Sequence, residues 1–156
     1  MALLVRLRKL VALPRGERGL LVLAAVCLPL TALGLRVAAF ERVLAALGRL
    51  AGRRPLEAEE ADVARRAQRT EQLVCWAARH GLHRGNCLSQ SLTLWWLLRR
   101  QGIASDLRLG VYKDAGRLEA HAWIECGGRV LNDRGGIRQR VVAFEGALPH
   151  DALQGR

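Results

Sequence analysis

The stretch that most constrains the fold is residues 86–100, NCLSQSLTLWWLLRR. Its leucines and tryptophans recur at helical spacing and spread around most of the cylinder, which predicts a buried central helix. Asn86 is a favoured N-cap residue, and Arg99 and Arg100 occupy the last turn, where cations suit the helix dipole. Cys87 then lies in the first turn, facing unpaired backbone N–H groups. That position favours the thiolate, the form that attacks carbonyl carbons.

After Gly102 the sequence period changes from helical to alternating. Residues 107–111 alternate apolar with charged or small side chains, which predicts a first strand. Residues 118–125 and 129–133 read as two further strands, and residues 141–144 as a last short one. Helices followed by an antiparallel meander indicate the α+β class. We therefore predict N-terminal helices and a central cysteine-bearing helix, packed on a small antiparallel sheet.

The hairpin register decides which side chains share a face of the sheet. A two-residue Gly-Gly turn would set His121 opposite Arg134 and point Asp133 to the other face. A three-residue turn with Gly128 left-handed sets His121 across from Asp133, with Cβ atoms about 5 Å apart. We predict this second register and interpret Cys87, His121 and Asp133 as nucleophile, base and orienter. The alternative for Asp133 is a turn former before the next glycine pair.

Three motifs resemble one known family: Asn86-Cys87-Leu88 at the head of the helix, His121-Ala122-Trp123, and Leu131-Asn132-Asp133. They are similar to those of the transglutaminase-like cysteine peptidases of lasso-peptide biosynthesis, in the same order. Relatives often carry a basic residue where this chain has Asn86. The resemblance implies a transglutaminase- or papain-like fold. It also implies a small bacterial enzyme that removes the leader from a ribosomally made precursor, through a Cys-His-Asp triad and a thioester.

The same resemblance implies partners. The substrate is the leader-bearing lasso precursor, and an ATP-dependent macrocyclase closes the released core. The chain shows no obvious leader-binding module, so a small stand-alone recognition protein is expected to present the leader. The apolar N-terminal helices or the hairpin edge are the expected docking surfaces, because an extended peptide can add to a strand edge. No cofactor is expected.

Two other functions stay open. The same triad performs acyl transfer, such as transglutamination, when an amine instead of water accepts the acyl group. A non-enzymatic interpretation is a basic, membrane-associated binding protein anchored by residues 19–35. Near the triad, Gln90 is expected on a solvated helix surface, with a position facing the site as the alternative. Trp123 is expected in the core, with the wall of the substrate cleft as the alternative.

Residues 19–35 carry no charged side chain and follow a basic start. Pro29 and Gly34 are expected to interrupt this run, so a helix facing the core or a partner is favoured over a membrane anchor or a cleaved signal. We expect a bacterial cytoplasmic protein, with membrane association as the alternative. The predicted organisation is an apolar helical region over 1–55, a cysteine peptidase core over 56–145 and a tail over 146–156.

The formal net charge is +11, and only Lys9 and Lys113 among the 25 basic residues are lysines. This excess of arginine is typical of a GC-rich coding sequence. We therefore attribute the positive charge partly to coding bias and partly to a docking surface for an acidic peptide or protein. Aromatic residues make up 4% of the chain, with little aromatic–basic interleaving. Nucleic-acid binding is therefore not predicted.

The cysteines are expected to be reduced thiols, since 156 residues supply a core without disulfides. Outside the triad they read as small buried hydrophobes, with Cys126 alternatively exposed in its turn. A zinc site is not expected, because the available ligands follow no common zinc spacing. The cysteines and histidines weighed in these two interpretations are Cys27, Cys75, Cys126, His80, His83 and Cys87.

Overall fold

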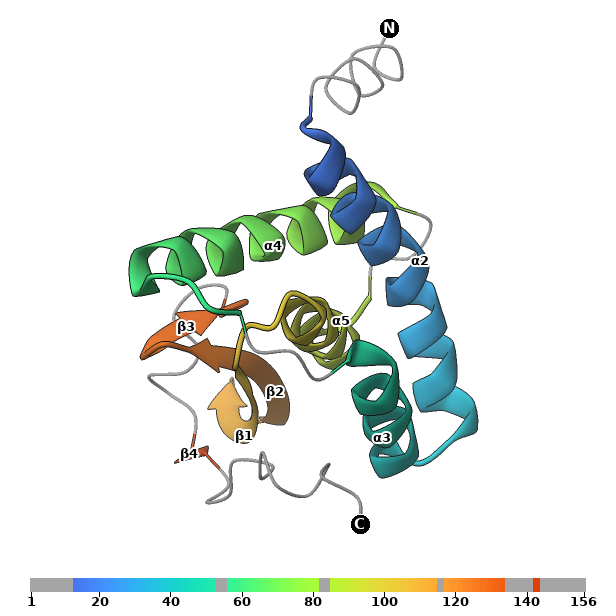
Figure 1. The fold of residues 1–156 in the computed structure, drawn as a ribbon. Helices are drawn as coiled ribbons and strands as arrows, with labels where there is room; N and C mark the ends of the chain where they lie inside the picture. Colours follow the sequence, from blue (N-terminus) through green and yellow to red (C-terminus); the bar gives the residue numbers. More distant parts are fainter. Residues whose placement is uncertain (1–12, 53–55, 82–84, 115–116, 134–141, 144–156) are drawn as a thin grey trace, which may run out of the picture.

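The structure, a computed structural model, describes residues 13–52, 56–81, 85–114, 117–133 and 142–143. Within these ranges, four helices precede an antiparallel sheet with strand order β3-β2-β1-β4 (Figure 1). The predicted α+β class is therefore confirmed. The elements are α2 (Arg15–Val37), α3 (Phe40–Ala51), α4 (Glu60–His80), α5 (Cys87–Arg100), β1 (Asp106–Asp114), β2 (Arg117–Cys126), β3 (Arg129–Leu131) and β4 (Val142–Ala143).

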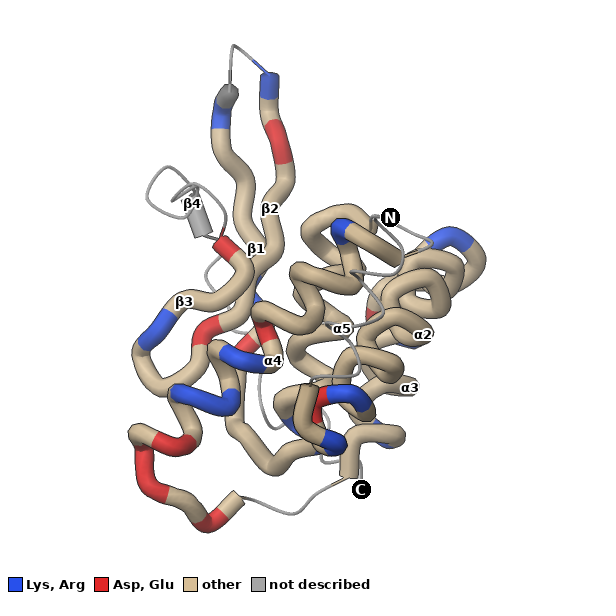
Figure 2. The backbone as a smooth tube through the Cα atoms, turned by 90° about the horizontal axis from the view of Figure 1, so that it is seen from above, with Lys and Arg blue, Asp and Glu red and all other residues tan. Residues whose placement is uncertain are grey.

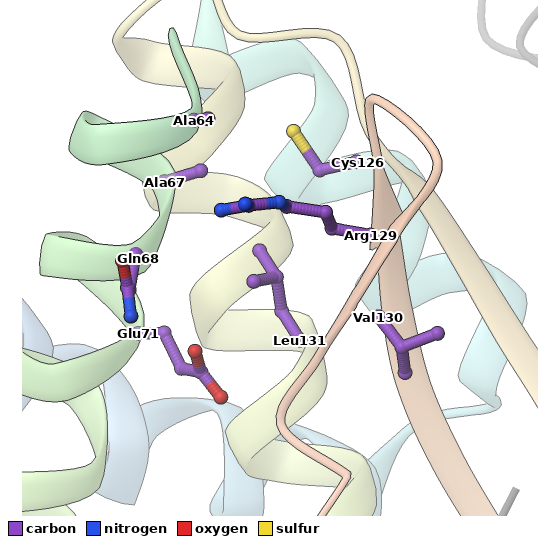
Figure 3. A pocket seen from close by; sticks show the side chains of 8 residues that line it. All are labelled: Ala64, Ala67, Gln68, Glu71, Cys126, Arg129, Val130 and Leu131. Atoms are coloured by element: carbon purple, nitrogen blue, oxygen red, sulfur yellow. The ribbon is translucent and has the colours of Figure 1, made fainter. Parts of the chain in front are cut away.

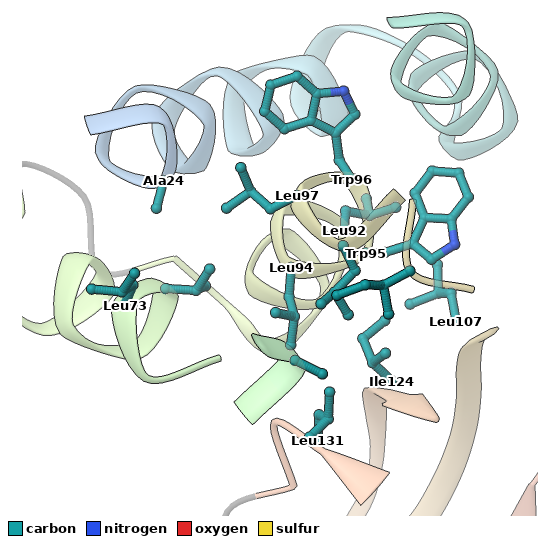
Figure 4. Close-up of a cluster of buried hydrophobic side chains, with 14 of the residues drawn as sticks. Ala24, Leu73, Leu92, Leu94, Trp95, Trp96, Leu97, Leu107, Ile124 and Leu131 are labelled. Atoms are coloured by element: carbon teal, nitrogen blue, oxygen red, sulfur yellow. The ribbon is translucent and has the colours of Figure 1, made fainter. Parts of the chain in front are cut away.

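Helix α5 is the central helix, as its apolar circumference predicted. Residues 89–98 are all buried, because α2, α3 and α4 surround α5 on one side and the sheet covers the other (Figure 1). Leu92, Leu94 and Leu97 are completely inaccessible to solvent. Figure 4 shows the side chains of α5 meeting Leu73 of α4 and Ile124 of β2 in one core. This core fixes α5 against β2, the two elements that matter most for the site.

Helix α2 runs from Arg15 to Val37 through Pro29, so the predicted interruption is wrong. Pro29 cannot donate an N–H to Ala25, but Ala25 faces solvent and packing of the neighbouring turns on α4 and α5 holds the helix together. Only one face of α2 is buried, so the expected core helix is half-exposed. Among the described helices, α2 alone is long and apolar enough to cross a membrane. The buried face consists of Leu21, Ala24, Leu28 and Thr31.

The β2–β3 hairpin has a two-residue turn, so the predicted three-residue turn is wrong. Cys126 pairs with Arg129, which leaves only Gly127 and Gly128 between the strands. Both glycines have positive φ, 53° and 72°, as a type I′ turn requires. This turn follows the right-handed twist of the strands, and adjacent glycines adopt it without steric cost. Cys126 ends β2 and is buried, instead of lying exposed in the turn.

The β1–β2 hairpin is longer than the sequence pattern predicted and extends beyond the helices (Figure 2). The strand expected over 107–111 is the centre of β1, and β4 lies within the expected 141–144 segment. Helix α4 begins at Glu60. The predicted tail over 146–156 lies outside the described residues.

Candidate active site

Cys87 is the first residue of α5, and Asn86 caps that helix as predicted. The Asn86 Oδ1 accepts a hydrogen bond from the Ser89 backbone N–H at 2.8 Å. The Cys87 side chain is only partly buried, so a substrate carbonyl can reach it. Its own N–H belongs to the first helical turn, where backbone donors have no intrahelical acceptor. The local geometry therefore combines a thiol with a backbone donor at the positive end of a helix dipole.

The bend before Cys87 is held by Gln90, which sequence reasoning placed on a solvated surface. Gln90 is buried, and its side-chain amide donates to the Gly85 carbonyl at 3.0 Å. Gly85 has φ 57°, and a Cβ there would lie 2.9 Å from Ser89 Oγ. The missed signal is the apolar circumference of α5 itself, because a helix buried on all sides leaves no solvated position for Gln90.

The first two turns of α5 lie against β2 on either side of His121. The Cys87 thiol donates to the Ala120 carbonyl across 3.9 Å. One turn later, Ser91 Oγ donates to the Ala122 carbonyl at 2.9 Å. These two contacts bracket His121 in the chain, so the thiol and the imidazole come from directly adjoining segments. The thiol hydrogen must leave Ala120 before it can pair with the imidazole.

His121 and Asp133 are in contact, the pair that the sequence placed together. His121 Nε2 lies 3.4 Å from Asp133 Oδ1, and the two side chains are 8% and 11% exposed. This distance is long for a hydrogen bond, and Nε2 has no well-aligned acceptor among the described residues. Such contacts often tighten only when substrate binds. Because Nε2 faces Asp133, Nδ1 is the ring nitrogen that this contact leaves for proton exchange.

The contact arises through Asn132 and not through the hairpin register. In the observed register Ile124 pairs with Leu131, so a continued strand would place Asp133 on the face opposite His121. Asn132 instead has φ 60°, a left-handed conformation that ends the alternation of β3. The chain turns there, and Asp133 reaches the imidazole.

A stacked tryptophan limits the movement of the imidazole. The rings of His121 and Trp123 are 6.0 Å apart and inclined by 18°. Trp123 is buried, as predicted, and its indole N–H donates to Glu125 at 3.2 Å. Arg108 donates to the other oxygen of the same carboxylate, also at 3.2 Å. This chain of contacts holds one side of the ring while Asp133 lies against Nε2.

The family assignment agrees with this geometry. Residues 27–145 match the family model for the transglutaminase-like superfamily. The chain belongs to this superfamily. Membership indicates a cysteine-dependent enzyme of the acyl-transfer or peptidase kind, and the matched range contains Cys87, His121 and Asp133. No curated protein and no solved structure gives a significant match.

Two of the other free cysteines of this transglutaminase-like chain, Cys27 and Cys126, are in poor settings for nucleophilic chemistry. Burial raises the pKa of Cys126, and the nearby Asp106 carboxylate raises it further. Burial likewise raises the pKa of Cys27. Within the described ranges, no three or more His, Cys, Asp or Glu side chains cluster as metal ligands do. His83, one of the weighed zinc ligands, lies outside those ranges.

A cavity of about 250 Å³ separates α4 from the β2–β3 hairpin (Figure 3). Arg129 extends across it toward α4, and Cys126 lines its wall. Glu71 borders the cavity, and its carboxylate accepts the Asn132 backbone N–H at 2.6 Å. The cavity is not lined by the candidate triad, and this hydrogen bond connects its wall to the segment that carries Asp133.

Proposed function

We propose that this transglutaminase-like protein is a cysteine endopeptidase that removes the leader from a lasso-peptide precursor. The observation that carries the chemistry is the 3.4 Å contact of His121 with Asp133, on the strand whose Ala120 carbonyl accepts from the Cys87 thiol. Nucleophile, base and orienter are the three roles that peptide hydrolysis by a thiol requires. The choice of a lasso leader depends on the resemblance of residues 85–133 to those peptidases.

In the first half-reaction, the Cys87 sulfur attacks the scissile carbonyl carbon and its proton passes to His121. A C–S bond forms as the carbonyl π electrons move onto oxygen. The Cys87 N–H at the start of α5 supports this oxyanion, and one such donor contributes about 3 kcal/mol in the transition state. The tetrahedral intermediate then expels the amine, which takes the proton from His121 and leaves a thioester.

In the second half-reaction, His121 takes a proton from water and the resulting hydroxide attacks the thioester. The C–S bond breaks, the thiolate is regenerated with its proton on His121, and the leader leaves as a carboxylic acid. Asp133 keeps the imidazole in one orientation and stabilises the imidazolium formed in both halves. Loss of Asp133 is therefore expected to leave a slow enzyme, and loss of Cys87 an inactive one.

The exposed face of α2 supports the proposed docking of a leader-recognition protein. Its apolar side chains are more than half exposed and form one stripe along the helix, a pattern typical of interaction surfaces. Arg15 and Arg36 are exposed at the two ends of the helix, so the matching surface is apolar with an acidic border. The same stripe is where an anionic membrane would bind if the localisation alternative holds. The stripe consists of Val22, Val26, Leu30, Leu33 and Val37.

Acyl transfer is the second candidate, because the superfamily match supports it as well as hydrolysis. Both reactions share the thioester and differ in the acceptor, which is water in one and an amine in the other; in transglutamination the acyl donor is a glutamine side chain and the group released is ammonia. The products separate them, since hydrolysis yields two peptides and transfer yields a cross-linked one.

Mass spectrometry of a cleavage reaction tests the proposal. The purified protein is incubated with a precursor peptide and a leader-recognition protein, both from neighbouring genes. The control variants are Cys87→Ala and Cys75→Ala, which remove one partly buried thiol each. A single cut that Cys87→Ala abolishes and Cys75→Ala retains supports the peptidase. Cross-linked products support transfer, and no product from the folded protein with both partners present contradicts both.

A further inference from the structure

Asn132 occupies the position that decides whether Asp133 reaches His121. The two-residue hairpin turn would leave Asp133 on the wrong face of the sheet, and the left-handed backbone at Asn132, φ 60°, corrects this. Of the residues with a Cβ, asparagine is among those that adopt this conformation most readily. The turn is therefore encoded by one residue that has no role in the proposed chemistry.

Asn132 is held from two helices at once. Its backbone N–H donates to Glu71 of α4 at 2.6 Å, and its side-chain amide donates to Ser91 Oγ of α5 at 2.8 Å. Ser91 Oγ in turn donates to the Ala122 carbonyl at 2.9 Å, next to His121. Asn132 and Ser91 are 5% and 0% exposed, so water does not replace these bonds. The same chain of contacts thus sets the backbone on both sides of the His121–Asp133 pair.

We propose that Asn132, anchored by Glu71 and Ser91, is a positioning residue that presents the Asp133 carboxylate to His121. This role depends on the proposed function in one respect, namely that the His121–Asp133 pair activates the Cys87 thiol. The hydrogen bonds of Asn132 run to Glu71 and Ser91, so its effect on the thiol is expected to pass mainly through Asp133. A displaced catalytic group commonly loses about 100-fold in rate, and changes at Asn132 are expected to approach that loss.

The test measures how fast iodoacetamide alkylates Cys87, followed by peptide mass spectrometry, and it needs no substrate. Asn132→Ala removes the amide and disfavours the left-handed backbone, so it is expected to slow alkylation as much as Asp133→Asn. Asn132→Gly restores that backbone and keeps the N–H to Glu71, so it is expected to recover much of the rate. The matched control is Thr93→Ala. Thr93 lies on α5 and is as buried as Ser91, but its hydroxyl group contacts Thr31 of α2.

A double variant distinguishes positioning from a general loss of stability. If Asn132 acts through Asp133, Asn132→Ala combined with Asp133→Asn is no slower than Asp133→Asn alone. Losses that multiply in the double variant overturn the proposal, as does a wild-type rate in Asn132→Ala. If Asn132→Ala does not fold, Ser91→Ala takes its place in the same cycle. Because alkylation is independent of cleavage, the expected pattern without any peptide product would keep this proposal and contradict the peptidase.

Discussion

Gly85 offers a direct test of how tightly the bend before Cys87 is packed. Replacement by alanine adds one methyl group to a backbone with φ 57°. That methyl would lie 2.9 Å from Ser89 Oγ, 3.4 Å from Gln90 Cγ and 3.5 Å from Leu28 Cδ2. Ser89 Oγ is not free to move, because it donates to the Asn86 carbonyl at 3.1 Å.

The size of the effect follows from two contributions. A left-handed alanine costs about 1–2 kcal/mol relative to glycine, of which the lower entropy of the unfolded chain offsets a part. Displacing Ser89 breaks a buried hydrogen bond, which adds about 1 kcal/mol, and overpacking adds about 1 kcal/mol more. Gly85→Ala is therefore expected to lower the free energy of unfolding by about 2–3 kcal/mol.

Gly127 supplies the matched control. It also has positive φ, 53°, but a Cβ there meets no atom within 4 Å. Gly127→Ala therefore isolates the backbone contribution and is expected to cost about 1 kcal/mol. Urea unfolding of both variants measures the difference, and alkylation of Cys87 should slow only in Gly85→Ala. Equal destabilisation would refute the packing argument, because the space beside Gly85 would then be open in solution.

Three further outcomes are expected from single contacts. Iodoacetamide at neutral pH should modify Cys87 well before Cys126, whose pKa is raised by burial and by Asp106; equal labelling by peptide mass spectrometry would contradict this. Asn86→Ala should lower the free energy of unfolding by about 1 kcal/mol, because the Ser89 N–H loses its cap, whereas Asn86→Asp keeps an acceptor and should stay near wild type. Arg69 donates to Glu17 at 2.6 Å, and this hydrogen bond lowers the pKa of the Glu17 carboxyl from its ordinary value of 4.5. The ion pair therefore stabilises the folded protein above pH 4.5, and this stabilisation is lost as the pH falls through the lowered pKa of Glu17. Glu17→Gln should cost about 0.5 kcal/mol at neutral pH and nothing in strong acid, and urea unfolding at both pH values measures this.

The central helix could be predicted because local and global signals agree along it. Asn86 caps the helix, the apolar residues surround it and the structure buries its full circumference. The expectation of a solvated Gln90 is wrong because a polar side chain can also be satisfied inside the protein, here by the Gly85 carbonyl. Pro29 predicts an interruption of residues 19–35 because proline weakens a helix locally, but the helix continues through it, and the sequence pattern does not reveal the packing of α2 on α4 and α5.

In the β2–β3 hairpin the predicted contact between His121 and Asp133 is present, but the predicted turn that was to produce it is wrong. Gly127 and Gly128 permit turns of two or three residues, and only the longer turn would set His121 opposite Asp133 through the register alone. The structure has the shorter turn and still brings the two side chains within 3.4 Å. The missed signal was Asn132, directly before Asp133, since asparagine is enriched in left-handed backbone.

The three candidate residues differ in how firmly the fold holds them. Cys87 opens a helix that is buried all round, and His121 lies within a paired strand beneath it. Asp133 follows the end of β3, and its position depends on the turn at Asn132. Sequence changes that preserve the core should therefore leave the thiol and the imidazole in place while shifting the carboxylate. Because a misplaced orienter slows such an enzyme without abolishing its chemistry, this turn is where the rate can vary most while the fold is kept.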